Sequence, residues 1–203
     1  MNQPTNEQRL RIDVGFAAGG GPLPLDHGYP LFASLCRALG NLHGARWLSV
    51  HPLLGTPLGD GLMALRQNPA TLRLRVDHDR LPTVLALAGK TLEVAGAQIP
   101  LGSSRIFLLQ PSAAIFSRQV SIRGYQEEAP FVERVKRELA NRGLEAELVL
   151  GRRRVITVSG KKVVGFGLTL RKLDERASLA LQTEGLGGRQ RFGCGVFSPL
   201  TEA

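Results

Sequence analysis

The sequence is poor in cysteine and contains no long apolar run. Of its 203 residues only two are cysteines, Cys36 and Cys194. They are too few for a disulfide framework, and they lack the spacing of a metal site. No stretch approaches the roughly 18 consecutive apolar residues that a membrane-spanning helix needs. The first 14 residues have neither the basic start nor the apolar run of a signal peptide. We therefore predict a cytoplasmic protein that has no membrane partner.

Aromatic and acidic residues are also few. An aromatic content of 5% argues against a platform that stacks on the bases of single-stranded nucleic acid. The 26 Lys and Arg residues outnumber the 17 Asp and Glu residues, giving a formal net charge of +9. Residues 1–102 carry a net charge of +2 and residues 103–203 carry +7. This excess suits a polyanionic partner, usually nucleic acid, bound mainly by the second half. A soluble basic protein without such a partner would have the same composition.

The first half alternates strand and helix patterns. Apolar and polar residues alternate over residues 9–16 and 71–79, which predicts two amphipathic strands. An apolar stripe at helical spacing over residues 28–42, preceded by Asp26 as a plausible cap, predicts a helix. A strand in residues 46–54, a short helix in 80–90 and a strand or hairpin in 91–101 complete the half. The order is roughly β-α-β-β-α-β.

The second half repeats this order. The expected elements are strands in 105–110 and 118–124, a helix in 129–143, a strand in 144–151, a hairpin in 152–172 turning at Ser159-Gly160, a helix from Asp174 and a closing strand in 192–197. Two such halves predict an α+β protein with tandem ferredoxin-like (RRM-like) domains. We place the N-terminal domain at residues 1–102 and the C-terminal domain at residues 103–203.

A glycine-rich segment, GLGGRQRFGCG, occupies residues 185–195. It is not a phosphate-binding P-loop, because Cys194 and Gly195 stand where a lysine and a serine or threonine are required. A simple turn would need fewer glycines. Glycines let a phosphate chain approach the main-chain N–H groups, and Arg189 and Arg191 add forked donors for phosphate oxygens. The segment therefore suits the backbone of a nucleic acid.

The segment follows the pattern G-h-G-x5-G-h-G, where h is apolar, and it precedes the last expected strand. In pattern, basic content and position it resembles the C-terminal glycine-rich loop of the CRISPR-associated repeat-RNA-processing endoribonucleases of the RAMP superfamily. Residues 23–47, with a proline-containing entry to the first helix and a Leu-His pair after it, resemble the corresponding segment of those enzymes. The two stretches cover about a fifth of the chain.

The resemblance implies an enzyme that cuts precursor RNA within its repeats without a metal ion or another cofactor. In that family the 2′-OH attacks the adjacent phosphate, leaving a 2′,3′-cyclic phosphate and a 5′-OH. The reaction needs proton transfer, for which histidine is well suited, and a cation beside the phosphorane. His43 matches the Leu-His position and is the first candidate. His27, near the start of the helix, is the second, and Arg46 is the nearest downstream cation.

The expected partner is the repeat stem-loop of a CRISPR precursor RNA, recognised through its phosphates and shape. Other subunits of a CRISPR effector complex could also bind, and the chain is expected to be a monomer or homodimer. A RAMP-type RNA-binding subunit without catalysis, and a ribosome-associated RNA-binding protein, remain alternatives. The candidate RNA-binding residues are Gly185, Gly187, Gly188, Arg189, Arg191, Phe192, Gly193, Gly195, Arg152, Arg153, Arg154 and Lys161.

Overall fold

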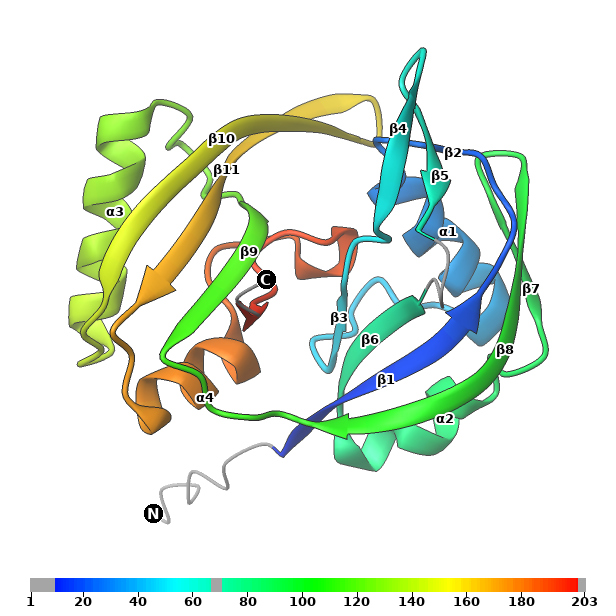
Figure 1. Ribbon diagram of the computed structural model, residues 1–203, viewed down its shortest axis with the longest axis horizontal. Helices are drawn as coiled ribbons and strands as arrows, with labels where there is room; N and C mark the ends of the chain where they lie inside the picture. Colours follow the sequence, from blue (N-terminus) through cyan, green and yellow to red (C-terminus); the bar gives the residue numbers. More distant parts are fainter. Residues whose placement is uncertain (1–9, 67–70, 201–203) are drawn as a thin grey trace.

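The computed structural model describes residues 10–66 and 71–200, so Arg9 of the first predicted strand lies outside the described residues. Two antiparallel sheets form the two sides of the molecule, and the C-terminal segment lies between them (Figure 1). The first sheet has the order β3-β6-β1-β8-β7. Its strands are β1 (Arg11–Ala18), β3 (Leu48–Val50), β6 (Thr71–Asp77), β7 (Thr91–Val94) and β8 (Ala97–Leu108), and its helices are α1 (Gly28–Leu39) and α2 (Leu81–Leu85).

The second sheet has the order β10-β11-β9-β12. Its strands are β9 (Ala114–Val120), β10 (Glu147–Val158), β11 (Lys161–Arg171) and β12 (Ser198–Pro199), and its helices are α3 (Glu128–Asn141) and α4 (Glu175–Glu184). In each half the first strand lies between the third and the last strand of the β-α-β-β-α-β unit. The predicted tandem ferredoxin-like fold is therefore confirmed.

Local sequence signals explain several element ends. The Asp174 side chain accepts a hydrogen bond of 2.6 Å from the backbone N–H of Ala177 and so caps α4. Ser159 and Gly160 have φ angles of 49° and 74°. Positive φ at both central residues is the geometry of a two-residue type I′ hairpin turn, here between β10 and β11. The predictions at both places are confirmed.

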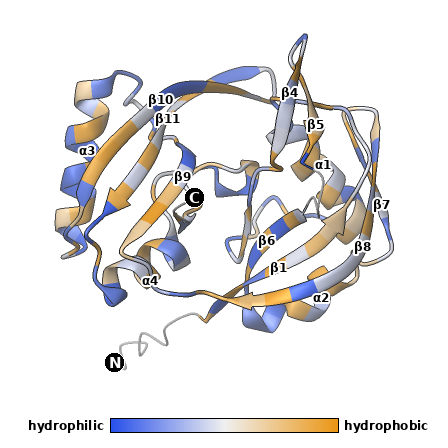
Figure 2. Ribbon diagram, viewed as in Figure 1, coloured by the Kyte–Doolittle hydropathy of each residue, from blue (hydrophilic) through white to orange (hydrophobic). Residues whose placement is uncertain are grey.

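Each half has its own apolar core. Leu72, Leu74 and Val76 alternate along β6 and are fully buried, as the period of two in a strand requires. In the second half, Phe131 of α3 packs on Phe166 of β11 with a centroid separation of 4.8 Å. Apolar positions accordingly alternate with polar ones along the strands in Figure 2.

Four details differ from the sequence prediction. Strand β8 continues through Ser103 and Ser104 to pair its last residue, Leu108, with Ile12 of β1. The predicted boundary between residues 102 and 103 therefore falls inside a strand, and residues 105–108 complete the first sheet. The closing strand is only β12, because Gly193 and Gly195 take positive φ and turn the chain before it.

The third difference concerns the start of α1. His27 is its N-cap residue and makes no capping hydrogen bond through its side chain. The Asp26 carboxylate instead accepts a hydrogen bond of 2.7 Å from the backbone N–H of Thr157 in β10. Asp26 thus joins the start of α1 to the second half. The fourth difference is a small third sheet that the sequence does not predict. Its strands, in order, are β2 (Leu23–Pro24), β5 (Leu62–Leu65) and β4 (Gly55–Gly59).

A fully buried arginine fastens the two halves. Arg75 of β6 is 1% exposed and donates two hydrogen bonds to Asp13 of β1, at 2.7 and 3.0 Å. Its Nη1 donates to the carbonyls of Gln182 and Phe197 in the second half, at 2.6 and 2.8 Å. Burial alone would raise the pKa of Asp13, but His51, whose Nε2 lies 3.5 Å from Oδ1, and the hydrogen bonds and charge of Arg75 hold this pKa well below its usual range. No helix within residues 10–66 and 71–200 is long and apolar enough to span a membrane.

Candidate active site between the two halves

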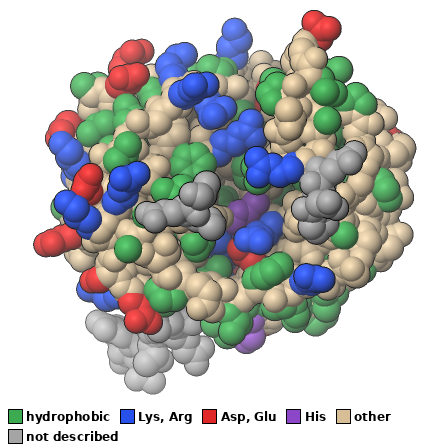
Figure 3. All heavy atoms as spheres, in the orientation of Figure 1, with side chains coloured by type: hydrophobic (Ala, Val, Ile, Leu, Met, Phe, Trp, Pro, Cys, Tyr) green, Lys and Arg blue, Asp and Glu red, His purple; other side chains and the backbone are tan. Residues whose placement is uncertain are grey.

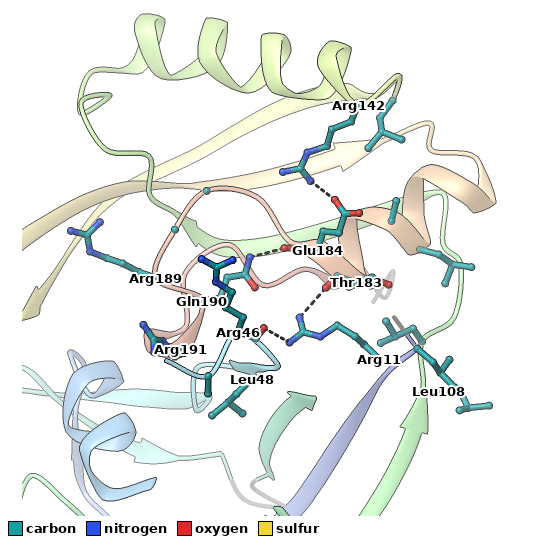
Figure 4. Close-up of a pocket in the computed structure, with 18 of the residues that line it drawn as sticks. Arg11, Arg46, Leu48, Leu108, Arg142, Thr183, Glu184, Arg189, Gln190 and Arg191 are labelled. Atoms are coloured by element: carbon teal, nitrogen blue, oxygen red, sulfur yellow. Dashed lines mark hydrogen bonds and ion pairs between the residues drawn. The ribbon is translucent and has the colours of Figure 1, made fainter. Parts of the chain in front are cut away.

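A groove of about 1920 Å³ lies where the two halves meet. The first half contributes residues 43–46 and the end of β8, and the second half contributes residues 187–191 and the exposed side of α4. Figure 4 shows Arg46 on the segment from the first half, and Arg189 and Arg191 on the facing segment from the second half. The groove therefore joins the segment that follows α1 to the glycine-rich segment, although about 140 residues separate them in the sequence.

His43 lies at the edge of this groove with its side chain exposed. Its ring packs edge-on against Phe32 of α1, with the ring centroids 5.7 Å apart. Its backbone N–H donates a hydrogen bond of 3.0 Å to Oδ1 of Asn41, which stabilises the turn after the helix. Arg46, three residues later, is also exposed and also lines the groove. Two candidate catalytic residues are thus brought together.

His27 lies elsewhere, buried at 2% exposure. Its Nδ1 is 3.0 Å from the Pro24 carbonyl, and its Nε2 is 3.1 Å from the backbone N–H of Leu53. The neutral ring with a proton on Nδ1 satisfies both contacts, as donor and acceptor in turn. Burial lowers the pKa of His27 below its ordinary value, which favours this neutral form. The structure therefore gives His27 a structural part, joining the start of α1 to the segment before β4, and does not place it in the groove.

The glycines of residues 185–195 are required mainly by the loop itself. A Cβ on Gly185 would collide with the carbonyl of Gly195, and a Cβ on Gly195 with that of Leu186. A Cβ on Gly187 would meet the carbonyl of Ser121 in the same way. Gly185, Gly187 and Gly195 of the G-h-G-x5-G-h-G pattern are therefore where the backbone crosses close to itself and to the residue after β9, whereas a Cβ on Gly193 would meet only the Pro52 ring, at 3.4 Å. At Gly188 a Cβ would meet nothing within 4 Å.

Two side chains of the loop hold it against α1. Arg191 donates a hydrogen bond of 2.9 Å to the Leu42 carbonyl, and its guanidinium lies 5.4 Å from the centre of the Phe32 ring. The ring of Phe192 packs on Phe32 and Tyr29 at centroid distances of 5.2 and 5.8 Å. Both residues thus position the loop beside His43, whereas the sequence pattern predicts that they contact RNA. Contacts of this kind cannot be read from the local pattern.

Arg189 differs from Arg191. It is exposed, takes a left-handed φ of 65°, and extends outward from the loop (Figure 4). Arg142 at the end of α3 lines the groove as well, but its guanidinium is bound to Glu138 at 2.6 Å, to Glu184 at 3.4 Å and to the Gly185 carbonyl at 2.9 Å. Arg46, Arg189 and Arg176 of α4, which is also exposed and lines the groove, are therefore the arginines best placed to meet an anion.

The basic residues of the β10–β11 hairpin do not line the groove. Arg152, Arg153 and Lys161 are exposed, and Arg154 is half-buried. Burial, with the charge of Arg154 as a second cause, lowers the pKa of Arg118 on β9. Figure 3 shows Lys and Arg side chains gathered over this hairpin and across the space between the halves. A bound RNA that reached both the hairpin and the groove would have to extend across the molecule.

Polar residues at and beneath the groove are not evident from the sequence, among them Arg11 and Gln190, which line it, and the buried Ser49 that is hydrogen-bonded to both. Arg11 and Arg75 alternate with apolar residues along their strands, which is the pattern of a solvent-facing side. That side is covered by the second half, and nothing in the local pattern signals it. Within the described residues, no group of three His, Cys, Asp or Glu side chains could hold a metal ion.

Comparisons with known proteins give a consistent result. A family model described as Cas6, Cas6 Crispr, matches residues 12–202. A protein of Myxococcus xanthus (strain DK1622) named CRISPR-associated endonuclease Cas6 is 40% identical over 188 residues, which cover 93% of this chain and 81% of the relative.

Solved structures show the same fold at low identity. A Cas6-related protein of Pyrococcus furiosus matches 95% of this chain and 100% of its own, with a TM-score of 0.70 and 11% identity. Thermus thermophilus Cse3, bound to an RNA that represents a pre-cleavage complex, matches 93% of this chain and 98% of its own, with a TM-score of 0.54 and 13% identity.

Proposed function

Since the chain belongs to the Cas6 family, we propose that it is an endoribonuclease that cleaves CRISPR precursor RNA within its repeats and releases guide RNAs. The observation that carries the proposal is the groove itself. An exposed histidine, His43, and two exposed arginines, Arg46 and Arg189, line one open groove between the halves of a basic protein. Such a set provides proton transfer and charge stabilisation for a phosphodiester.

The proposed reaction is an internal transesterification. The 2′-oxygen attacks the adjacent phosphorus as its proton leaves, and the bond from phosphorus to the 5′-oxygen breaks as that oxygen gains a proton. The products are a 2′,3′-cyclic phosphate and a 5′-OH end. His43 transfers one of these protons, because imidazole can donate or accept a proton near neutral pH. Arg46 and Arg189 stabilise the extra negative charge on the phosphorane, and no metal ion or other cofactor takes part.

We assign the RNA contacts according to which residues of the loop and hairpin are exposed. Arg189 and the open backbone at Gly188 face the RNA at the groove, whereas Arg191, Phe192 and the crossing glycines shape the loop behind it. The hairpin residues Arg152, Arg153, Arg154 and Lys161 bind the phosphates of the repeat stem. In this proposal His27 supports the start of α1 and does not react.

The test is cleavage of the cognate repeat RNA by the purified chain in the presence of EDTA. We expect a single cut with a 2′,3′-cyclic phosphate on the upstream product. An unrelated hairpin of the same length is the matched control and should stay intact. Tight binding of the repeat without turnover would support the alternative, a RAMP-type RNA-binding subunit of a CRISPR effector complex. Equal binding of both hairpins would favour a general RNA-binding protein.

A further inference from the structure

A chain of side-chain hydrogen bonds runs beneath the groove and joins its two walls. Ser49 Oγ of β3 donates to Oε1 of Gln190 at 2.8 Å, and Gln190 lies in the glycine-rich loop. Nη1 of Arg11 donates to the same Ser49 Oγ at 3.2 Å. Ser49 is 1% exposed and Arg11 is 6% exposed. The three residues come from β1, β3 and the loop, so tertiary packing alone brings them together.

Arg11 also donates hydrogen bonds to backbone carbonyls on both sides of the groove. Its Nη1 donates to the Thr183 carbonyl at 2.9 Å, just before the glycine-rich loop begins. Its Nη2 lies 3.4 Å from the Arg46 carbonyl, in the turn that follows His43. Nε donates to Asp77 at 3.0 Å and fixes the guanidinium on its own sheet. One buried cation is thus bonded to the segment of each wall that carries a proposed functional arginine (Figure 4).

The loop is shaped to receive this chain. Nε2 of Gln190 donates to the Glu184 carbonyl at 2.6 Å, so the amide bridges the end of α4 and Ser49. A Cβ on Gly185 would come within 2.5 Å of that Nε2. The first glycine of the motif therefore leaves room for the Gln190 amide as well as for the backbone crossing. Arg189 directly precedes Gln190 in the chain, so the position of Arg189 depends on where Gln190 is held.

We propose that Ser49 and Gln190, with Arg11 behind them, are positioning residues that hold Arg189 and the loop in register with the turn of His43 and Arg46. The inference rests on the proposed function, since register matters for chemistry only if the groove is where the RNA is cut. None of the three touches the reacting atoms. They act by fixing the distance between the two walls, and a displacement of about 1 Å at a reacting centre can cost on the order of 100-fold in rate.

The test separates the rate of cleavage from the affinity for RNA. Ser49→Ala and Gln190→Leu are measured in single-turnover cleavage with enzyme in excess, and their Kd is measured with repeat RNA that carries a 2′-deoxy residue at the cut. Each variant should cleave about 10- to 100-fold more slowly while its Kd stays within about threefold of the wild-type value. The arginines and the hairpin that bind phosphates are still present, which is why affinity should persist.

Gln182→Leu is the matched control. Gln182 is a buried amide of α4 whose Nε2 donates to the Gln110 carbonyl and to Ser178 Oγ, and its side chain does not reach the loop. It should lower the melting temperature at least as much as Gln190→Leu but leave the cleavage rate unchanged. The proposal is overturned if Ser49→Ala and Gln190→Leu cleave at the wild-type rate, if rate and affinity fall together, or if Gln182→Leu slows cleavage equally. Absence of cleavage by the wild-type chain would overturn the proposed function instead.

Discussion

Replacing Arg75 by methionine should destabilise the protein severely, because it leaves a buried carboxylate without its main partner. Arg75 is 1% exposed, and its side chain makes four hydrogen bonds, two to Asp13 and one each to the carbonyls of Gln182 and Phe197. Removing one member of a buried ion pair costs about 3–5 kcal/mol. For a chain of this length each kcal/mol lowers the melting temperature by about 2–4 °C. The expected decrease is therefore about 6–20 °C.

The measurement is calorimetry together with urea unfolding, and Arg73→Met is the matched control. Arg73 is on the same strand and also approaches Asp13, at 3.8 Å, but its side chain is 36% exposed and its guanidinium lies over Phe107. An exposed pair of this kind contributes about 1 kcal/mol or less, and the cation–π contact about as much. If the two variants have equal melting temperatures, Arg75 does not fasten the halves and the reasoning is refuted.

Three further predictions follow from the loop and from His27. Gly195→Ala should lower the melting temperature, because the new Cβ would collide with the Leu186 carbonyl. Gly188→Ala should leave the melting temperature unchanged and weaken RNA binding, because its Cβ would meet nothing within 4 Å in the protein. Equal melting temperatures for the two variants would contradict this. Arg189→Ala should reduce the slope of log Kd against log salt by about 0.7–0.9, one phosphate contact, and an unchanged slope would show that Arg189 does not bind a phosphate. Burial lowers the pKa of His27 in the folded protein. The neutral ring therefore stabilises the fold fully above the unfolded pKa near 6.5. As the pH falls below this value, the free energy of unfolding decreases by up to about 1.4 kcal/mol per pH unit. Denaturant titrations between pH 7.5 and 5 should show a weaker pH dependence in His27→Gln, and an unchanged dependence would contradict the assignment.

The sequence predicts the fold well where local signals act alone. The alternation in β6, the helix that begins at Asp174 and the turn at Ser159-Gly160 each depend on neighbouring residues, and each is confirmed. The end of β8 depends on pairing with β1, so Ser103 and Ser104 looked like a break between halves although the strand runs through them. The small β2-β5-β4 sheet was missed for a similar reason, because its strands are short and contain glycine and proline.

The sequence predicts which segments form the site, but it does not predict which of their side chains hold the loop and which face the RNA. His43 of the Leu-His pair and residues 187–191 of the glycine-rich motif line the same groove. The motif alone could not show that Arg191 and Phe192 bind α1 while Arg189 faces outward. Arg11 and Ser49 were missed because polar residues that alternate with apolar ones normally face water. Here the second half covers that side of the sheet, so that Arg11 lines the groove and Ser49 lies buried beside it.

The central claim is that the groove holding His43 performs the cleavage without a metal ion. The most direct test is single-turnover cleavage of the cognate repeat RNA in EDTA by the wild-type chain, His43→Ala and His27→Gln. The account predicts that wild type and His27→Gln cleave, and that His43→Ala is slower by about 10²–10⁴-fold while its Kd for the RNA is unchanged. Cleavage by His43→Ala at the wild-type rate, or loss of wild-type cleavage in EDTA, would contradict it.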